Sequence, residues 1–313
     1  MSTHYPLSAE MAGFVARTLS FSSSASDMNE QRAAYSKMCQ AFNPSRPAGL
    51  VVTDFELADV PVRSYRPDSL APDTAADCVL YLHGGGWVVG DLDSHDFICT
   101  DLALDLGCVV LAVDYRLAPE HPFPAAFEDC VAVWHGIQAQ ADWLRVDPLK
   151  VAVAGDSAGA TLAAALCLAL RDAGQRQPCS QVLIYPALGG AADLPSRSEC
   201  ADAPLLSSVD IDCYQALYAT TAQHMRSPYA WPLLAQDFSQ LAPAFIAVAQ
   251  FDPLRDDGVV YEQKLREAGV ATRFYWGGGL VHGCLRAKGL AEEADELYLW
   301  LIGALSWNGK RNQ

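Results

Sequence analysis

Beyond residue 50, apolar residues gather into short runs that alternate with longer amphipathic or alanine-rich segments. Most runs are continuous rather than alternating in polarity, which is typical of strands that helices bury on both faces. We expect strands at Cys78–Leu82, Cys108–Asp114, Lys150–Ala154, Gln181–Tyr185, Ala244–Ala249 and Thr272–Trp276. We expect helices at Asp93–Leu106, Ala125–Gln140, Ala158–Ala173, Asp257–Ala268 and Ala291–Ala304. This order predicts an α/β fold with a mostly parallel, doubly wound sheet.

An antiparallel strand pair precedes these elements, and two further segments do not fit the alternation. Val51–Leu57 and Pro61–Arg66 resemble an antiparallel pair of strands at the sheet edge. Residues 1–45, here called the N-terminal arm, are expected to form one or two helices before any strand. Residues 189–225, here called the insertion, interrupt the pattern and contain a helical stretch at Ser208–Thr221 behind a serine and acidic start. We expect arm and insertion to form a cap over a catalytic domain at residues 46–313; ordinary peripheral packing is the alternative.

The composition favours one decorated domain over two. The chain has 313 residues, is 51% hydrophobic, and shows no linker, repeat or low-complexity tract that would divide it.

A net charge of −16, from 37 acidic and 21 basic residues, argues against nucleic acid or an anionic membrane surface as partner. The first residues lack a signal-peptide pattern, and the longest apolar stretch, Leu162–Leu170, is short of the ~20 residues that span a bilayer. We expect a soluble cytoplasmic protein.

Ten cysteines are scattered along the chain without any CxxC pair. Several, such as Cys78, Cys108 and Cys167, lie in apolar runs, where a reduced cysteine packs as a small hydrophobic side chain. Zinc sites need closely spaced Cys and His ligands, and disulfides are rare in the cytosol. We therefore expect neither a metal site nor structural disulfides.

The segment around Ser157 carries the first sign of chemistry. The apolar run Val151–Val153 leads into Gly155-Asp156-Ser157-Ala158-Gly159, and an Ala/Leu-rich helical stretch follows at once. Strand, sharp turn with a serine between two glycines, then helix is the order of a nucleophile elbow. The glycines would leave room where strand and helix approach closely. An ordinary serine in a glycine-flanked turn is the alternative, because the pentapeptide is common by chance.

A serine nucleophile needs a base and a carboxylate that orients it. His282 follows the strand Thr272–Trp276 in a glycine-rich loop, which places it at the same sheet edge as Ser157. Asp252 follows the strand Ala244–Ala249 at that edge. Rival carboxylates are Asp256 and Asp257, for which a position at a helix N-terminus is a sufficient structural reason. The histidines His4, His95, His121, His135 and His224 lack such placement and are expected to be surface or internally bonded residues.

The segment His83-Gly84-Gly85-Gly86-Trp87 follows the strand Cys78–Leu82. Glycines let backbone N–H groups converge on one point, as an oxyanion hole requires. We predict that the N–H groups of Gly84, Gly85 and Ala158 form this hole and that His83 supports the loop through hydrogen bonds. A phosphate-binding loop is disfavoured, because no Lys-Ser/Thr follows and the spacing is not GxGxxG.

These motifs together resemble the hormone-sensitive-lipase family of esterases, close to bacterial acetyl esterase. The resemblance rests on HGGGWVVGDLD at His83–Asp93, VDYRLAPEHPFPAAF at Val113–Phe127, the GDSAG segment, and FDPLRDDG at Phe251–Gly258. It implies an α/β-hydrolase fold with a helical cap, short-chain acyl esters as substrates and no cofactor. It also places Ser157, Asp252 and His282 on the triad positions. The chain departs from the family where Cys284 follows His282-Gly283 in place of a bulky aromatic residue.

Several points stay open at this stage. We expect Trp87, next to the glycine loop, to contact a small ester substrate; a homodimer is left open. An amidase or lactone hydrolase would use the same triad. A non-catalytic ligand-binding protein on a hydrolase scaffold would be expected to lack a catalytic residue, whereas Ser157, Asp252 and His282 are all present.

Overall fold

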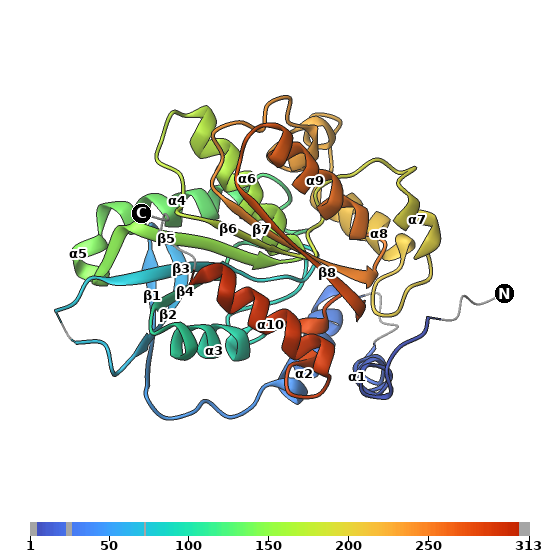
Figure 1. The fold of residues 1–313 in the computed structure, drawn as a ribbon, viewed down its shortest axis with the longest axis horizontal. Coiled ribbons are helices and arrows are strands. Elements are labelled where there is room, and N and C mark those ends of the chain that lie inside the picture. The colour runs from blue at the N-terminus through green and yellow to red at the C-terminus, as the bar shows by residue number, and fades with distance from the viewer. Residues whose placement is uncertain (1–4, 23–26, 72, 307–313) are drawn as a thin grey trace.

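An eight-stranded sheet with strand order β1-β2-β4-β3-β5-β6-β7-β8 forms the centre of the computed structural model (Figure 1). The structure describes residues 5–22, 27–71 and 73–306, so His4 lies outside the described residues. The strands are β1 (Leu50–Leu57), β2 (Val60–Pro67), β3 (Ala76–Leu82), β4 (Val109–Val113), β5 (Val146–Asp156), β6 (Gln181–Ile184), β7 (Ala244–Phe251) and β8 (Thr272–Val281). β1 and β2 are antiparallel to their neighbours and β3 to β8 are parallel, which confirms the predicted sheet.

Helices cover both faces of the sheet. α3 and α10 pack with one hydrophobic core, and α4, α6 and α9 pack with the other (Figure 1). Their bounds are α3 (Asp96–Leu106), α4 (Ala125–Ala139), α5 (Ala141–Leu144), α6 (Ala158–Asp172), α9 (Arg255–Glu267) and α10 (Glu292–Leu305). Strand β3 shows why its apolar run is continuous: Leu80 and Leu82 enter one core, while Val79 and Tyr81 enter the other. None of the described helices is both long and apolar enough to cross a membrane.

The glycine-rich segment before His282 corrects one expectation. Gly277–Gly279 belong to β8, which continues to Val281, instead of forming a loop after Trp276. The pairing with β7 shifts register between Ala249 and Phe251, so the strand is irregular here. A Cβ on Gly277 would lie 2.6 Å from the Val248 carbonyl oxygen, and Gly279 has φ +76°. The glycines thus allow an irregular strand to carry His282 to the end of the sheet.

Arm and insertion both contribute helices near the carboxyl ends of the parallel strands (Figure 1). They are α1 (Ala9–Leu19) and α2 (Met28–Phe42) in the arm, and α7 (Pro195–Glu199) and α8 (Ser208–Tyr218) in the insertion. Arg32 holds α2 to the body, since its guanidinium donates to the Val88 and Ala118 carbonyls and pairs with Glu120 at 2.6 Å. A capping box at Ser207 starts α8.

Candidate active site

Ser157 stands between β5 and α6 with φ +53° and ψ −119°, a strained backbone conformation for a residue with a side chain. Its N–H donates to the Ile184 carbonyl at 2.8 Å, which fixes the turn to the neighbouring strand. A Cβ on Gly155 would lie 2.5 Å from the backbone of Gly159, and one on Gly159 would collide with the Leu82 carbonyl. Both glycines are therefore required by the close approach of strand and helix.

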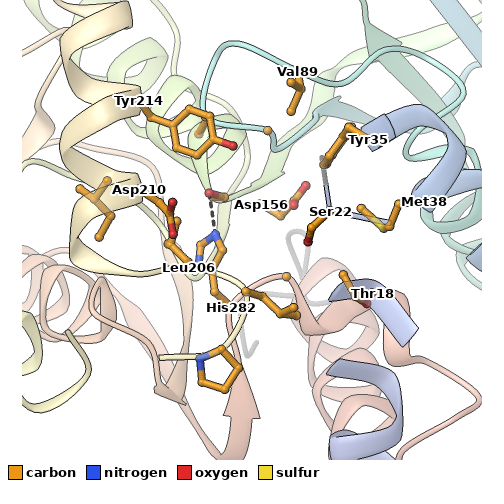
Figure 2. Close-up of a pocket in the computed structure, with 18 of the residues that line it drawn as sticks. Thr18, Ser22, Tyr35, Met38, Val89, Asp156, Leu206, Asp210, Tyr214 and His282 are labelled. Atoms are coloured by element: carbon orange, nitrogen blue, oxygen red, sulfur yellow. Dashed lines mark hydrogen bonds between the residues drawn. The ribbon is translucent and has the colours of Figure 1, made fainter. Parts of the chain in front are cut away.

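The structure brings together Ser157, His282 and Asp252. The Ser157 Oγ lies 2.9 Å from His282 Nε2, at the dashed line in Figure 2. His282 Nδ1 lies 2.7 Å from Asp252 Oδ2, and this carboxylate is fully buried. Asp252 Oδ1 also accepts the Leu254 N–H at 2.8 Å. With Nδ1–H donating to Asp252, Nε2 is left to accept the serine proton.

The rival carboxylates do not contact His282. Asp256 accepts the Ser196 N–H at 2.8 Å and pairs with Arg255. Asp257 is fully buried, pairs with Arg197 at 2.6 Å and accepts the N–H groups of Leu188 and Gly190. Both carboxylates therefore connect the insertion to α9.

The glycine loop differs from the sequence-based prediction at Gly84. Its N–H donates to Asp156 Oδ1 at 3.0 Å, so it is not free to bind an oxyanion. Gly85 and Gly86, with φ +127° and +60°, line the cavity at Ser157 together with Ala158. No acceptor among the described residues is found for the Gly85 and Gly86 N–H groups. Three successive glycines look equivalent in the sequence, whereas in the structure the hydrogen bond to Asp156 sets Gly84 apart.

Asp156 connects the glycine loop to the nucleophile turn. Its carboxylate is buried and accepts the Tyr81 hydroxyl at 2.9 Å in addition to the Gly84 N–H, and His95 Nε2 lies 3.2 Å away. Burial alone would raise the pKa of Asp156, but His95, Arg286 and the Tyr81 hydrogen bond outweigh it and hold that pKa well below its usual range. The side chain is thus a buried anion that anchors both loops. Its place in the GDSAG motif was visible in the sequence, but its partners were not.

Two buried histidines support this arrangement. His83 Nδ1 lies 2.8 Å from the Gly84 carbonyl, and burial lowers the pKa of His83 to about 3, so the ring is neutral. The Tyr115 hydroxyl donates to the His83 carbonyl at 2.6 Å. The predicted hydrogen-bonding role of His83 in the loop is confirmed. His95 is internally bonded, as expected of a histidine outside the site.

A cavity of about 740 Å³ opens above Ser157 and His282. Figure 2 shows Leu206, Asp210 and Tyr214 on one side of it, and Thr18, Tyr35 and Met38 on the other. The insertion and the arm therefore form opposite walls. Trp87 also lines the cavity, but only 2% of its surface is exposed, and its ring stacks on Tyr218 at a centroid distance of 4.2 Å. Within the described ranges, no three His, Cys, Asp or Glu side chains gather as ligands of a metal ion.

Comparisons with known proteins identify the family and the fold. A family described as having the alpha/beta hydrolase fold matches residues 79–286. The chain is 39% identical to an ethyl acetate hydrolase of Pseudomonas putida over 85% of this chain and 84% of the relative. It is 34% identical to an acetyl esterase of Salmonella paratyphi B, covering 86% and 84% respectively. The solved structure of a hyperthermophilic esterase from Pyrobaculum calidifontis superimposes with a TM-score of 0.88 at 33% identity, covering 96% of this chain and 98% of that one.

Proposed function

Because the chain belongs to the hormone-sensitive-lipase-like family of α/β-hydrolases, we propose that it is a serine carboxylesterase that hydrolyses short-chain acyl esters through an acyl-enzyme. Relatives named esterases at about 40% identity make it a carboxylic ester hydrolase. The observation that carries the catalytic assignment is the pair of hydrogen-bond distances, 2.9 Å and 2.7 Å, that join Ser157 to His282 and His282 to Asp252.

In the proposed mechanism, His282 Nε2 takes the proton of Ser157 as Oγ attacks the ester carbonyl. Asp252 keeps Nδ1 protonated and stabilises the imidazolium that forms. His282 then gives the proton to the leaving alcohol, which breaks the ester bond and leaves the acyl group on Ser157. His282 then takes a proton from water as the water oxygen attacks the acyl carbon, and it returns this proton to Ser157 Oγ as the acyl–oxygen bond breaks and the acid is released.

The oxyanion would be bound by the N–H groups of Gly85, Gly86 and Ala158. Gly85 and Ala158 were expected from the sequence, and Gly86 replaces Gly84, whose N–H is bonded to Asp156. Ala158 is the first residue of α6, so its N–H has no acceptor within the helix and lies at the positive end of the helix dipole. Both features suit a developing negative charge.

We propose that residues 1–45 and 189–225 are the two parts of a cap over a catalytic domain at 46–313. Support comes from the cavity walls, to which α1, α2 and α8 all contribute. Trp87 would contact the substrate from the cavity wall, where little of its surface is exposed. The partner of this site is a small ester molecule.

A homodimer and a cytoplasmic location are further parts of the proposal. The sheet ends at β8, where Trp276 is 47% exposed, and the adjacent α10 exposes Leu299 and Trp300. These apolar side chains favour contact with a second copy through this edge.

All ten cysteines are free, which is what a reducing compartment such as the cytoplasm maintains. Cell fractionation would test the location.

Replacing Ser157 with alanine tests the function directly. Without Oγ there is no nucleophile, so hydrolysis of p-nitrophenyl acetate should drop by about 10⁴-fold or more, to a residual rate. An organophosphonate should add its mass to the wild-type chain at Ser157 and leave Ser157→Ala unlabelled. The nearby Thr161→Ser variant keeps a hydroxyl and serves as a control that should stay active. A folded Ser157→Ala variant with near-wild-type turnover would disprove serine catalysis.

A further inference from the structure

Arg286 is a buried cation in the cavity wall that the catalytic mechanism does not use. It lies in the short 3-10 turn Cys284–Ala287, four residues after His282, and only 8% of its surface is exposed. Its Nη2 donates to the Tyr35 hydroxyl of α2 at 2.8 Å and lies 3.2 Å from His95 Nε2. Its Nε is buried without a hydrogen-bond partner, and no hydrogen bond to a nitrogen or oxygen of the described residues uses Nη1.

The guanidinium therefore has N–H groups without an oxygen or nitrogen acceptor. It carries five N–H groups, and its contacts with Tyr35 and His95 involve the same nitrogen. The Cys39 thiol on α2 is also close: burial raises the pKa of Cys39, and the charge and hydrogen bond of Arg286 oppose that rise. A neutral thiol is a weak acceptor and does not replace an oxygen. Leaving buried donors of a charged group unpaired costs free energy that a ligand oxygen would recover.

A second group without a partner lies in the same wall. Thr18 Oγ1, at the end of α1, is buried and has no hydrogen-bond partner among the described residues. Figure 2 shows Thr18, Tyr35 and Met38 together on the arm side of the cavity. The arm side thus combines unpaired polar atoms with apolar surface.

The charge of Arg286 is already balanced. Asp156 is a buried anion, and His95 Nε2 lies within 3.2 Å of both the Asp156 carboxylate and Arg286 Nη2. A substrate carboxylate would lose its water near the Asp156 anion and would find no cation left to balance its charge. Asp210, which lines the opposite wall, is a second carboxylate that would repel it. A neutral oxygen can accept a hydrogen bond from Arg286 without that cost.

We propose that Arg286 is a specificity-determining residue that selects esters bearing a neutral oxygen acceptor, such as a ketone, ether or hydroxyl, in the acyl or alcohol part. This proposal rests on the proposed esterase function of the same cavity. A hydrogen bond from a charged donor corresponds to a preference on the order of tenfold to a hundredfold in kcat/KM over an apolar substrate of the same shape.

Matched ester pairs test this proposal. One pair varies the acyl part, ethyl 4-oxopentanoate against ethyl 4-methylpentanoate; the other varies the alcohol, 2-methoxyethyl acetate against butyl acetate. The ratio of kcat/KM within each pair is measured for the wild type, Arg286→Lys, Arg286→Met and the exposed control Arg226→Lys. Intrinsic ester reactivity cancels when the same ratio is compared between variants. Thermal unfolding followed by circular dichroism checks each fold, and Arg286→Lys keeps a positive charge for Asp156 if Arg286→Met does not fold.

The wild type and Arg226→Lys should prefer the oxygen-bearing member of at least one pair, and both folded Arg286 variants should lose that preference. A wild type without preference, or a folded Arg286→Lys variant that keeps it, would overturn the proposal. Faster hydrolysis of monoethyl succinate than of either ketone or ether would overturn the neutral-oxygen class in favour of an anion. A wild type that hydrolyses acetate esters without any such preference leaves the esterase function intact, whereas an active Ser157→Ala variant would overturn that function itself.

Discussion

Three aspartates follow β7 within six residues, and at the residue scale their surroundings give them different roles. Asp252 is fully buried and bonded to His282, whereas Asp256 and Asp257 bond backbone N–H groups and arginines that fasten the insertion. A carboxylate that fixes a tautomer matters to the reaction only if it contacts the imidazole. Contact with His282, more than position in the motif, therefore separates the catalytic candidate from the structural ones.

Asp252→Asn should lower kcat for p-nitrophenyl acetate by about 10⁴-fold, the loss typical when the carboxylate of such a triad becomes an amide. The amide can donate to Nδ1 and so favours the wrong imidazole tautomer. Asp256→Asn is the matched control: it should keep kcat within a few-fold while losing stability, because the Arg255 pair is weakened. Equal losses of kcat in the two variants would contradict the assignment.

Asp114 gives a pH-dependent prediction. Burial raises the pKa of Asp114 to about 6, and the neighbouring carboxylates of Asp91, Asp93 and Asp54 add to this while Arg63 opposes it. Between about pH 4 and 6 the folded state keeps a proton that the unfolded state has lost, so stability falls as pH rises through this window. Asp114→Asn removes that titration. Urea midpoints measured from pH 4 to 8 should therefore fall less steeply in the variant; parallel curves would contradict it.

At the element scale, the hydrophobic runs predicted β3, β4, β6 and β7 to within two residues at each end, because strands buried on both faces leave a simple signature. Strand β5 begins at Val146, four residues before its predicted start. The end of β8 was missed. Gly277–Gly279 read as a loop because glycine is depleted in strands, but the register shift against β7 makes glycine the residue that the irregular strand needs. A signal that depends on the partner strand is not contained in the local sequence.

The exposed edge of the sheet at β8 predicts where two copies of the chain would associate. If two copies associate there, light scattering should give the mass of two chains, and Trp276→Glu should lower it to one by placing a desolvated charge in the contact. Trp143→Glu is the control, since Trp143 is 60% exposed on α5, in a helix that does not pack on β8. A wild type with the mass of one chain at all concentrations would refute the dimer.

At the scale of the whole molecule, local motifs were enough to pick out three residues that the fold brings together, Ser157, Asp252 and His282, because each follows a strand whose carboxyl end faces the same edge. They were not enough for the network behind it. Arg286, His95 and Tyr35 are separated by 60 residues or more along the chain, and no motif marks any of them. The choice of Gly84 was wrong for the same reason, since the partner of its N–H is 72 residues away. Contacts between distant segments appear only when the chain is folded.

The two cavity walls together predict the preferred acyl length. Each buried methylene would gain about 0.8 kcal/mol in an apolar pocket, or about fourfold in affinity. The arm side instead presents Tyr35 and, bonded to it, Arg286, and an alkyl chain laid against them would exclude water without pairing their donors. We therefore expect kcat/KM for p-nitrophenyl esters to be highest at two to six acyl carbons and to decline by twelve. Ser157→Ala measured in parallel supplies the background rate for each ester. A rate that keeps rising to twelve carbons would mean that the arm side is effectively apolar and that the enzyme is a lipase.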